Sequence, residues 1–127
     1  MGLVEEQFDA LAARPRFADA KLTPSQNGTY LVTIPHFSLP PGWNKAETTV
    51  YFQIPVGYPT ARPDTFWTDF DLGLASNAKP MNTGENNNHG LNVPLLWFSW
   101  HPSTWNPNRD TLITYVGLIR KRLEDPR

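Results

Sequence analysis

The chain has 127 residues, with 11 lysines and arginines, 12 aspartates and glutamates, and a formal net charge of -1. This length is typical of one domain with a modest hydrophobic core, so we expect a single domain over residues 1–127. The balanced charge and the lack of a basic run argue against nucleic acid or a membrane surface as a partner. The absence of cysteine excludes disulfides, thiolate zinc sites and a thiol nucleophile.

The sequence also limits the cellular setting and the helix content. No apolar run approaches the ~20 residues that span a membrane, and "MGLVEEQFDALAARPR" lacks the charged start and apolar core of a secretion signal. We therefore expect a cytoplasmic protein. The 13 prolines cluster in the middle of the chain and exclude long helices there.

The first predicted element is a short amphipathic helix over residues 3–13. Apolar side chains recur at helical spacing, acidic side chains lie elsewhere, and Pro15 ends the pattern. The apolar positions are Leu3, Val4, Phe8, Leu11 and Ala12.

Four runs rich in β-branched and aromatic residues predict strands in meander order. The Asn27-Gly28 pair between the first two runs is a strong hairpin signal. The third run alternates polar and apolar side chains, as expected for a strand with one buried face. The four runs are residues 18–22, 29–37, 47–55 and 65–70.

The second half of the chain predicts a long loop and then a helix. Residues 71–92 are polar and irregular, and a loop this long in so small a domain is typically functional or mobile. An apolar stripe then predicts a helix of about four turns that begins at Asn108 or Asp110 and carries basic residues at 120–122 near its negative end. The predicted fold class is α+β: an N-terminal helix, a four-stranded antiparallel meander, a long irregular segment that would hold the active site, and one long C-terminal helix.

Two motifs in this order resemble those of the ubiquitin-conjugating enzymes. The stretch "IPVGYPTARPDTFWTD" resembles the segment between the third and fourth strands of that family, with Tyr58, Pro59 and Pro63 at the matching positions. Downstream, Trp105 and Pro107 match the Trp-x-Pro that precedes the family's long helix. The resemblance covers roughly residues 3–123 and implies the ubiquitin-conjugating (UBC) fold.

The chain departs from that family in three ways. It has no catalytic cysteine, it lacks the His-Pro-Asn motif, and we expect the family's last two helices to be absent. It most resembles the short prokaryotic ubiquitin-conjugating-like proteins of family E, because "WFSWH" and "WNPNRDTL" fit their Trp-apolar-Ser-x-His and Trp-x-Pro-x-x-Asp-Ser/Thr-Leu pattern. Counting back from Trp105, the family's nucleophile falls near residue 97, and Ser99 is the only nucleophilic side chain close by.

Ser99 and His101 form the candidate catalytic pair. A serine hydroxyl needs a base to become nucleophilic, and imidazole titrates in the useful range. If the two residues continue a strand, they share one face at a Cα separation of roughly 6.6–7 Å, within reach of each other. An amide of Asn88 or Asn92, or of the neighbouring residues 86–87, is the candidate to stabilise an oxyanion or support the loop. Four rings would exclude water from the site: Trp97, Phe98, Trp100 and Trp105.

Each of these candidate residues also has a purely structural interpretation. Ser99 and His101 would then only pack the domain, and Trp105 and Pro107 would be core and turn residues. His36 and His89 are interpreted as structural or exposed, and no metal site is expected because no acidic residue stands beside them at ligand spacing. The tryptophans offer a further alternative, a face that stacks on sugars.

Two functions follow from the resemblance. In the first, the protein belongs to a bacterial ubiquitin-like conjugation pathway: it accepts a ubiquitin-like protein from an activating enzyme, holds it as an oxyester on Ser99 and passes it to an acceptor. In the second, it is a catalytically inactive UBC-fold module that binds a ubiquitin-like protein or its activating enzyme. The partners that the resemblance implies are a ubiquitin-like protein and a ubiquitin-activating-like enzyme, and it implies no cofactor.

Overall fold

The computed structural model describes residues 2–127. It has α-helices near both ends, α1 (Leu3–Ala12) and α2 (Leu112–Leu123), and two short 3-10 helices, η1 (Pro15–Phe17) and η2 (Gln26–Gly28). The strands are β1 (Lys21–Pro24), β2 (Tyr30–Ser38), β3 (Glu47–Ile54), β4 (Phe66–Asp69), β5 (Thr83–Glu85) and β6 (Leu95–Phe98). The predicted α+β class and the two terminal helices are confirmed. None of the helices described in residues 2–127 is long and apolar enough to span a bilayer.

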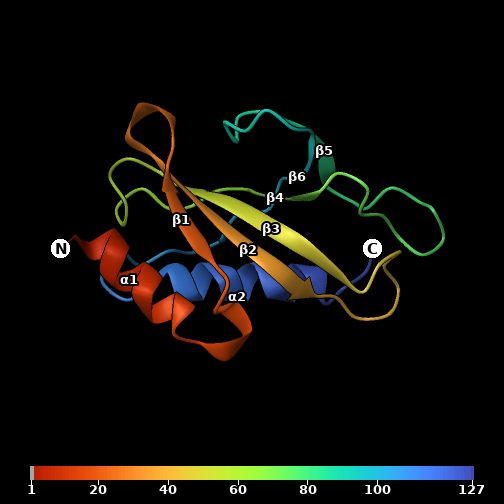
Figure 1. Ribbon diagram of the computed structural model, residues 1–127, viewed down its shortest axis with the longest axis horizontal. Helices are drawn as coiled ribbons and strands as arrows, with labels where there is room; N and C mark the ends of the chain where they lie inside the picture. The colour runs from red at the N-terminus through yellow and green to blue at the C-terminus, as the bar shows by residue number, and fades with distance from the viewer. Residues whose placement is uncertain (1) are drawn as a thin grey trace.

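All strands belong to one antiparallel sheet with the order β1-β2-β3-β4-β6-β5 (Figure 1). The first four follow the predicted meander, but the predicted count of four strands was wrong. Strand β6 lies in the aromatic run that the sequence marks as chemically interesting, and it adds to the free edge of β4. Strand β5 has only three residues, with Gly84 at its centre, so its pattern is too short to detect.

Helix α2 begins later than either predicted N-cap. Thr111 is the N-cap, and its side chain and that of Thr114 cap each other's backbone N–H groups. The Asp110 carboxylate instead accepts the backbone N–H of Asn106 at 2.7 Å, within the turn before the helix. Asn108 lies in that turn too, so neither residue caps the helix.

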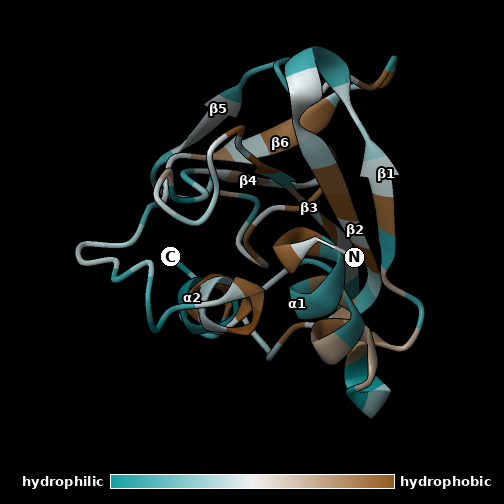
Figure 2. Cartoon of the chain, turned by 90° about the vertical axis from the view of Figure 1, so that its left-hand side faces the viewer, coloured by the Kyte–Doolittle hydropathy of each residue, from teal (hydrophilic) through white to brown (hydrophobic). Residues whose placement is uncertain are grey.

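The main core fills the space between the sheet and the two helices. Figures 1 and 2 both show α1 and α2 on the same side of the sheet. Phe66 of β4 stacks on Phe98 of β6 with ring centroids 4.6 Å apart, and Phe52 packs edge-on against Tyr115 of α2. Burial of such large apolar side chains is the main stabilising contribution in a domain of this size.

The irregular segment packs on the other face of the sheet. Trp67 alternates with the core residue Phe66, so its ring lies on that face, where it is buried. Its indole N–H donates to the Asn86 carbonyl at 2.8 Å, and the Gln53 amide donates to the Asn88 carbonyl at 2.6 Å. His89 is fully buried edge-on against Trp67. This part of the predicted loop is therefore held to β3 and β4 by direct contacts.

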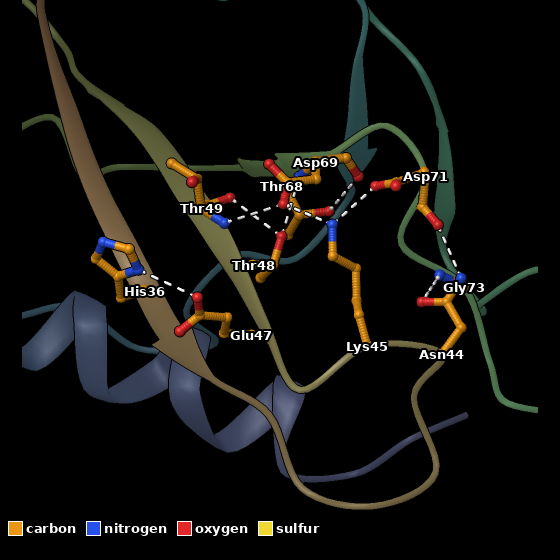
Figure 3. Close-up of polar contacts among 10 residues, drawn as sticks. All are labelled: His36, Asn44, Lys45, Glu47, Thr48, Thr49, Thr68, Asp69, Asp71 and Gly73. Atoms are coloured by element: carbon orange, nitrogen blue, oxygen red, sulfur yellow. Dashed lines mark hydrogen bonds and ion pairs between the residues drawn. The ribbon is translucent and has the colours of Figure 1, made fainter.

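A polar cluster fastens the far end of β4 to the loop before β3. The Lys45 ammonium lies 2.9 Å from a carboxylate oxygen of Asp69 and 2.9 Å from one of Asp71 (Figure 3). The Asp69 backbone N–H donates to the Thr48 hydroxyl at 3.1 Å. Hydrogen bonding to Lys45 lowers the pKa of Asp71. Hydrogen bonding to Asp69, and then to Asp71, raises the pKa of Lys45. These contacts join segments more than 20 residues apart, which no local pattern predicts.

Candidate functional site

Ser99 lies one residue beyond the end of β6. Its backbone N–H donates to the Asn82 carbonyl at 2.8 Å, which extends the β5–β6 pairing by one hydrogen bond. The expectation that Ser99 and His101 share one face of a strand was wrong. On its β4 side, strand β6 has no partner beyond Phe98, because β4 begins at Phe66 after a proline-containing turn. Pro102 also has no N–H to donate.

His101 lies near Asp64 instead of making a hydrogen bond to Ser99. Its Nδ1 is 3.8 Å from Asp64 Oδ1, and both side chains are more than half exposed. No hydrogen bond joins Ser99 and His101 in residues 2–127, and the Ser99 hydroxyl has no hydrogen-bond partner there. Burial, and then the charge of Asp64, raise the pKa of the Tyr115 phenol. Sequence reasoning missed Asp64, which lies 37 positions before His101.

The four rings predicted to surround Ser99 pack against different partners. Phe98 is fully buried in the main core, and Trp100 packs against its edge. Trp97 pairs across the sheet with Trp67, and Trp105 packs against Tyr58 with ring centroids 6.1 Å apart. They therefore do not form one water-excluding wall. Trp43 and Trp67 are buried, and the other three tryptophans are half-buried.

Asn88 and Asn92, which were predicted to support the site, are both exposed. The Asn88 backbone bonds to the Asn86 and Gln53 side chains, and no hydrogen bond joins Asn88 or Asn92 to Ser99. The asparagine next to Ser99 is Asn82, which has a left-handed backbone with φ 60°. No local signal identifies Asn82, because the β5–β6 register alone brings it there.

Arg122 of α2 fixes the backbone around this site. Its side chain is 2% exposed, and its guanidinium donates to the carbonyl oxygens of Met81 at 3.0 Å, Asp125 at 3.0 Å and Arg127 at 2.9 Å. Three aromatic rings surround it, at 5.2 to 5.9 Å from the guanidinium carbon: Trp43, Phe98 and Trp100. Burial lowers the pKa of Arg122, yet an arginine stays protonated. Arg122 thus links residues 81–82 to residues 98–100, on both sides of Ser99.

The family-motif residues form a structural cluster. The Trp105 indole N–H donates to the Pro59 carbonyl at 2.8 Å, and the Tyr58 hydroxyl donates to Gln7 of α1. The same Gln7 oxygen accepts the backbone N–H of Leu112 at 3.1 Å, so the cluster joins α1 to the start of α2. Pro63 is buried and Pro107 half-buried. These contacts connect the turn before β4 to both helices.

Two further expectations concern His36 and a metal site. His36 is exposed, and its Nδ1 lies 3.1 Å from a Glu47 carboxylate oxygen, which raises the pKa of His36 (Figure 3). Residues 2–127 contain no group of three His, Cys, Asp or Glu side chains arranged to hold a metal ion. The chemically available groups near β6 are thus the Ser99 hydroxyl, the exposed imidazole of His101 and the Asp64 carboxylate.

The chain is an α+β domain whose candidate site contains no thiol. The chain belongs to Prokaryotic E2 family E, whose family model matches residues 20–126. E2 denotes the ubiquitin-conjugating enzymes, so membership indicates a conjugating-enzyme-type transferase. Such membership also implies interaction with a ubiquitin-like protein and an activating enzyme. Comparison with curated proteins and with solved structures gave no match.

Proposed function

We propose that the protein carries a ubiquitin-like protein as an oxyester on Ser99 in a bacterial conjugation pathway and transfers it to an acceptor amine or hydroxyl. One observation carries the proposal: in a cysteine-free member of the family, the Ser99 hydroxyl directly follows β6 and is engaged in no hydrogen bond within residues 2–127. A hydroxyl bonded to backbone would have to break that bond before it reacts.

The chemistry assigns a role to each available group. Ser99 Oγ attacks the activated C-terminal carbonyl carbon of the ubiquitin-like protein, forming a C–O bond as the bond to the activating enzyme breaks. His101 takes the hydroxyl proton and passes it to the leaving group. Asp64 orients the imidazole, as an acidic residue does in a serine–histidine–aspartate triad. In the second step the acceptor amine or hydroxyl attacks the ester carbonyl and the bond to Ser99 Oγ breaks. The acceptor's proton passes through His101 to Ser99 Oγ.

A groove beside the site offers room for the incoming C-terminal tail. It has a volume of about 300 Å³, begins at Pro102 and continues along the face of α2 that includes Tyr115 and Leu118. Its lining residue Pro102 directly follows His101, so a tail bound there would pass close to this segment. Binding of the tail would also move Ser99 and His101 together, because catalytic hydrogen bonds are often long or absent until the substrate binds.

The test is an adduct assay with the cognate ubiquitin-like protein, activating enzyme and ATP. We expect an adduct that survives thiol reductants, is cleaved by hydroxylamine or mild alkali, and is lost in Ser99→Ala. Ser76→Ala is the matched control, because Ser76 is an exposed serine outside the groove that would hold the tail. An adduct that persists in Ser99→Ala would show that Ser99 is not the nucleophile. An adduct lost equally in Ser76→Ala would show that the loss is not specific to Ser99.

The same assay tests His101. As a general base, His101 contributes roughly 10²–10⁴-fold to the single-turnover rate. His101→Gln should therefore slow adduct formation by that factor without lowering the melting temperature, because the side chain is more than half exposed. An unchanged rate would remove His101 and Asp64 from the mechanism.

The second candidate function is a catalytically inactive binding module. The observation that favours it is the lack of any hydrogen bond between Ser99 and His101. This function predicts measurable affinity for the ubiquitin-like protein or its activating enzyme and no covalent product, with wild type and Ser99→Ala equal in every assay.

A further inference from the structure

A second groove lies on the opposite flank of α2 from the Ser99 segment. This groove consists of two adjoining cavities between η1 and α2, of about 690 and 380 Å³, whose linings share Arg16, Phe17 and Arg120. We call it the arginine groove. The flank of α2 that faces Trp100 carries Tyr115 and Arg122 instead. A partner in the arginine groove therefore leaves Ser99 accessible.

The charge of this groove differs from that of the chain. Its walls carry three arginines (Arg14, Arg16 and Arg120) and one glutamate (Glu124), on a protein whose net charge is -1. Arg120 lies 3.5 Å from Glu124, but Arg14 and Arg16 are exposed and make no ion pair within residues 2–127. The apolar floor includes Phe17 and Val116. Unpaired arginines around an apolar floor complement an acidic segment with an apolar side chain.

Gly117 gives an independent indication that another molecule approaches here. It lies in the interior of α2, where glycine destabilises a helix relative to alanine. A Cβ added at this position would meet no atom within 4 Å, so packing within the domain does not require glycine. Gly117 borders both the arginine groove and the groove beside Ser99. Its missing side chain keeps the ridge between them flat, which permits close approach of a partner's backbone.

We infer that the arginine groove is the docking surface for an acidic, amphipathic segment of the activating enzyme that delivers the ubiquitin-like protein. The inference rests on the proposed function for the identity of the partner. Carboxylates of the segment pair with Arg14 and Arg16, an apolar side chain contacts Phe17, and the backbone crosses α2 at Gly117. The activating enzyme is the partner that must be bound while Ser99 is still free, and this position meets that requirement.

The test measures binding of the purified activating enzyme to the full chain by calorimetry, in a Ser99→Ala background so that no covalent step contributes. Arg16→Glu should weaken binding by roughly tenfold or more. Lys79→Glu is the matched control, because it makes the same charge change at an exposed residue outside the groove. It should change binding by less than about threefold.

Gly117 supplies a second test that separates folding from docking. Gly117→Ala and Gly117→Gln should both raise the melting temperature, by roughly 2–5 °C, because both residues favour helix. Only Gly117→Gln should also weaken binding by about tenfold, since its long side chain occupies the ridge. A loss of binding in a more stable protein cannot come from misfolding.

The outcomes distinguish the groove from the chemistry. Normal binding by both Arg16→Glu and Gly117→Gln overturns the docking surface, even if the adduct on Ser99 forms. Equal weakening by Arg16→Glu and Lys79→Glu also overturns it, because nonspecific charge would then explain the effect. Groove-dependent binding without any adduct supports the docking surface and overturns the serine carrier. No binding by the parent chain overturns the docking surface, and an adduct assay on wild type then decides the carrier separately.

Discussion

Replacement of the buried Arg122 by methionine tests how the site is held in place. Methionine has a similar length and is apolar, so it fills much of the space but donates no hydrogen bonds. The wild-type guanidinium makes three hydrogen bonds to carbonyl oxygens, those of Met81, Asp125 and Arg127. Each hydrogen bond to a charged group contributes about 1.5–3 kcal/mol, and water can replace the partners near the exposed C-terminal residues. We therefore expect a loss of about 3 kcal/mol in the free energy of unfolding.

For a domain of this size, that loss lowers the melting temperature by roughly 10–15 °C. Arg122→Lys should recover little of it, because one ammonium cannot reproduce the planar fork of the guanidinium. The assays are thermal melting and hydrogen exchange. The Ser99 amide, which donates to the Asn82 carbonyl next to Met81, should exchange faster in both variants. A melting temperature within about 2 °C of wild type for Arg122→Met, or full rescue by lysine, would refute the reasoning.

Two further predictions concern His89 and Trp105. Burial lowers the pKa of His89, so as the pH falls below about 6.5 the unfolded chain takes up this proton before the folded one. The free energy of unfolding should then fall by up to ~1.4 kcal/mol per pH unit. Urea melts of wild type and His89→Phe at pH 7.5 and 5.5 measure this, and an identical pH dependence of the two proteins would contradict it. The opposite contribution of His36, whose pKa is raised, is present in both proteins and cancels. Trp105→Phe removes the hydrogen bond to the Pro59 carbonyl, so urea melts should show a loss of about 1 kcal/mol or more, whereas an unchanged midpoint would mean that the bond does not stabilise the domain.

The elements with a strong local pattern could be predicted from the sequence. The helix over 3–13 and the strands now seen as β2 and β3 have clear periodicity. The Asn27-Gly28 turn marks the hairpin between β1 and β2. The late start of α2 also had a signal, because Thr111 and Thr114 stand at the spacing of a capping box. Asn108 and Asp110, which precede these threonines, were stronger N-cap candidates by residue type.

The arrangement around Ser99 could not be predicted, because long-range pairing determines it. Asn82, not Asn88 or Asn92, adjoins Ser99 through the register of a three-residue strand. Arg122 was assigned to the helix end as a dipole partner, although it follows Tyr115 and Ile119 at helical spacing on the inward face. A basic residue on an apolar stripe is a usable signal for a buried, hydrogen-bonded charge.

The substitution Ser99→Cys tests the serine carrier most directly. The chain contains no cysteine, so this change introduces its only thiol and leaves the rest of the domain as it is. With the ubiquitin-like protein, activating enzyme and ATP, the wild-type adduct should resist a thiol reductant and the Ser99→Cys adduct should be released by it, because an ester becomes a thioester. If the Ser99→Cys adduct resists the reductant as the wild-type adduct does, residue 99 does not carry the ubiquitin-like protein.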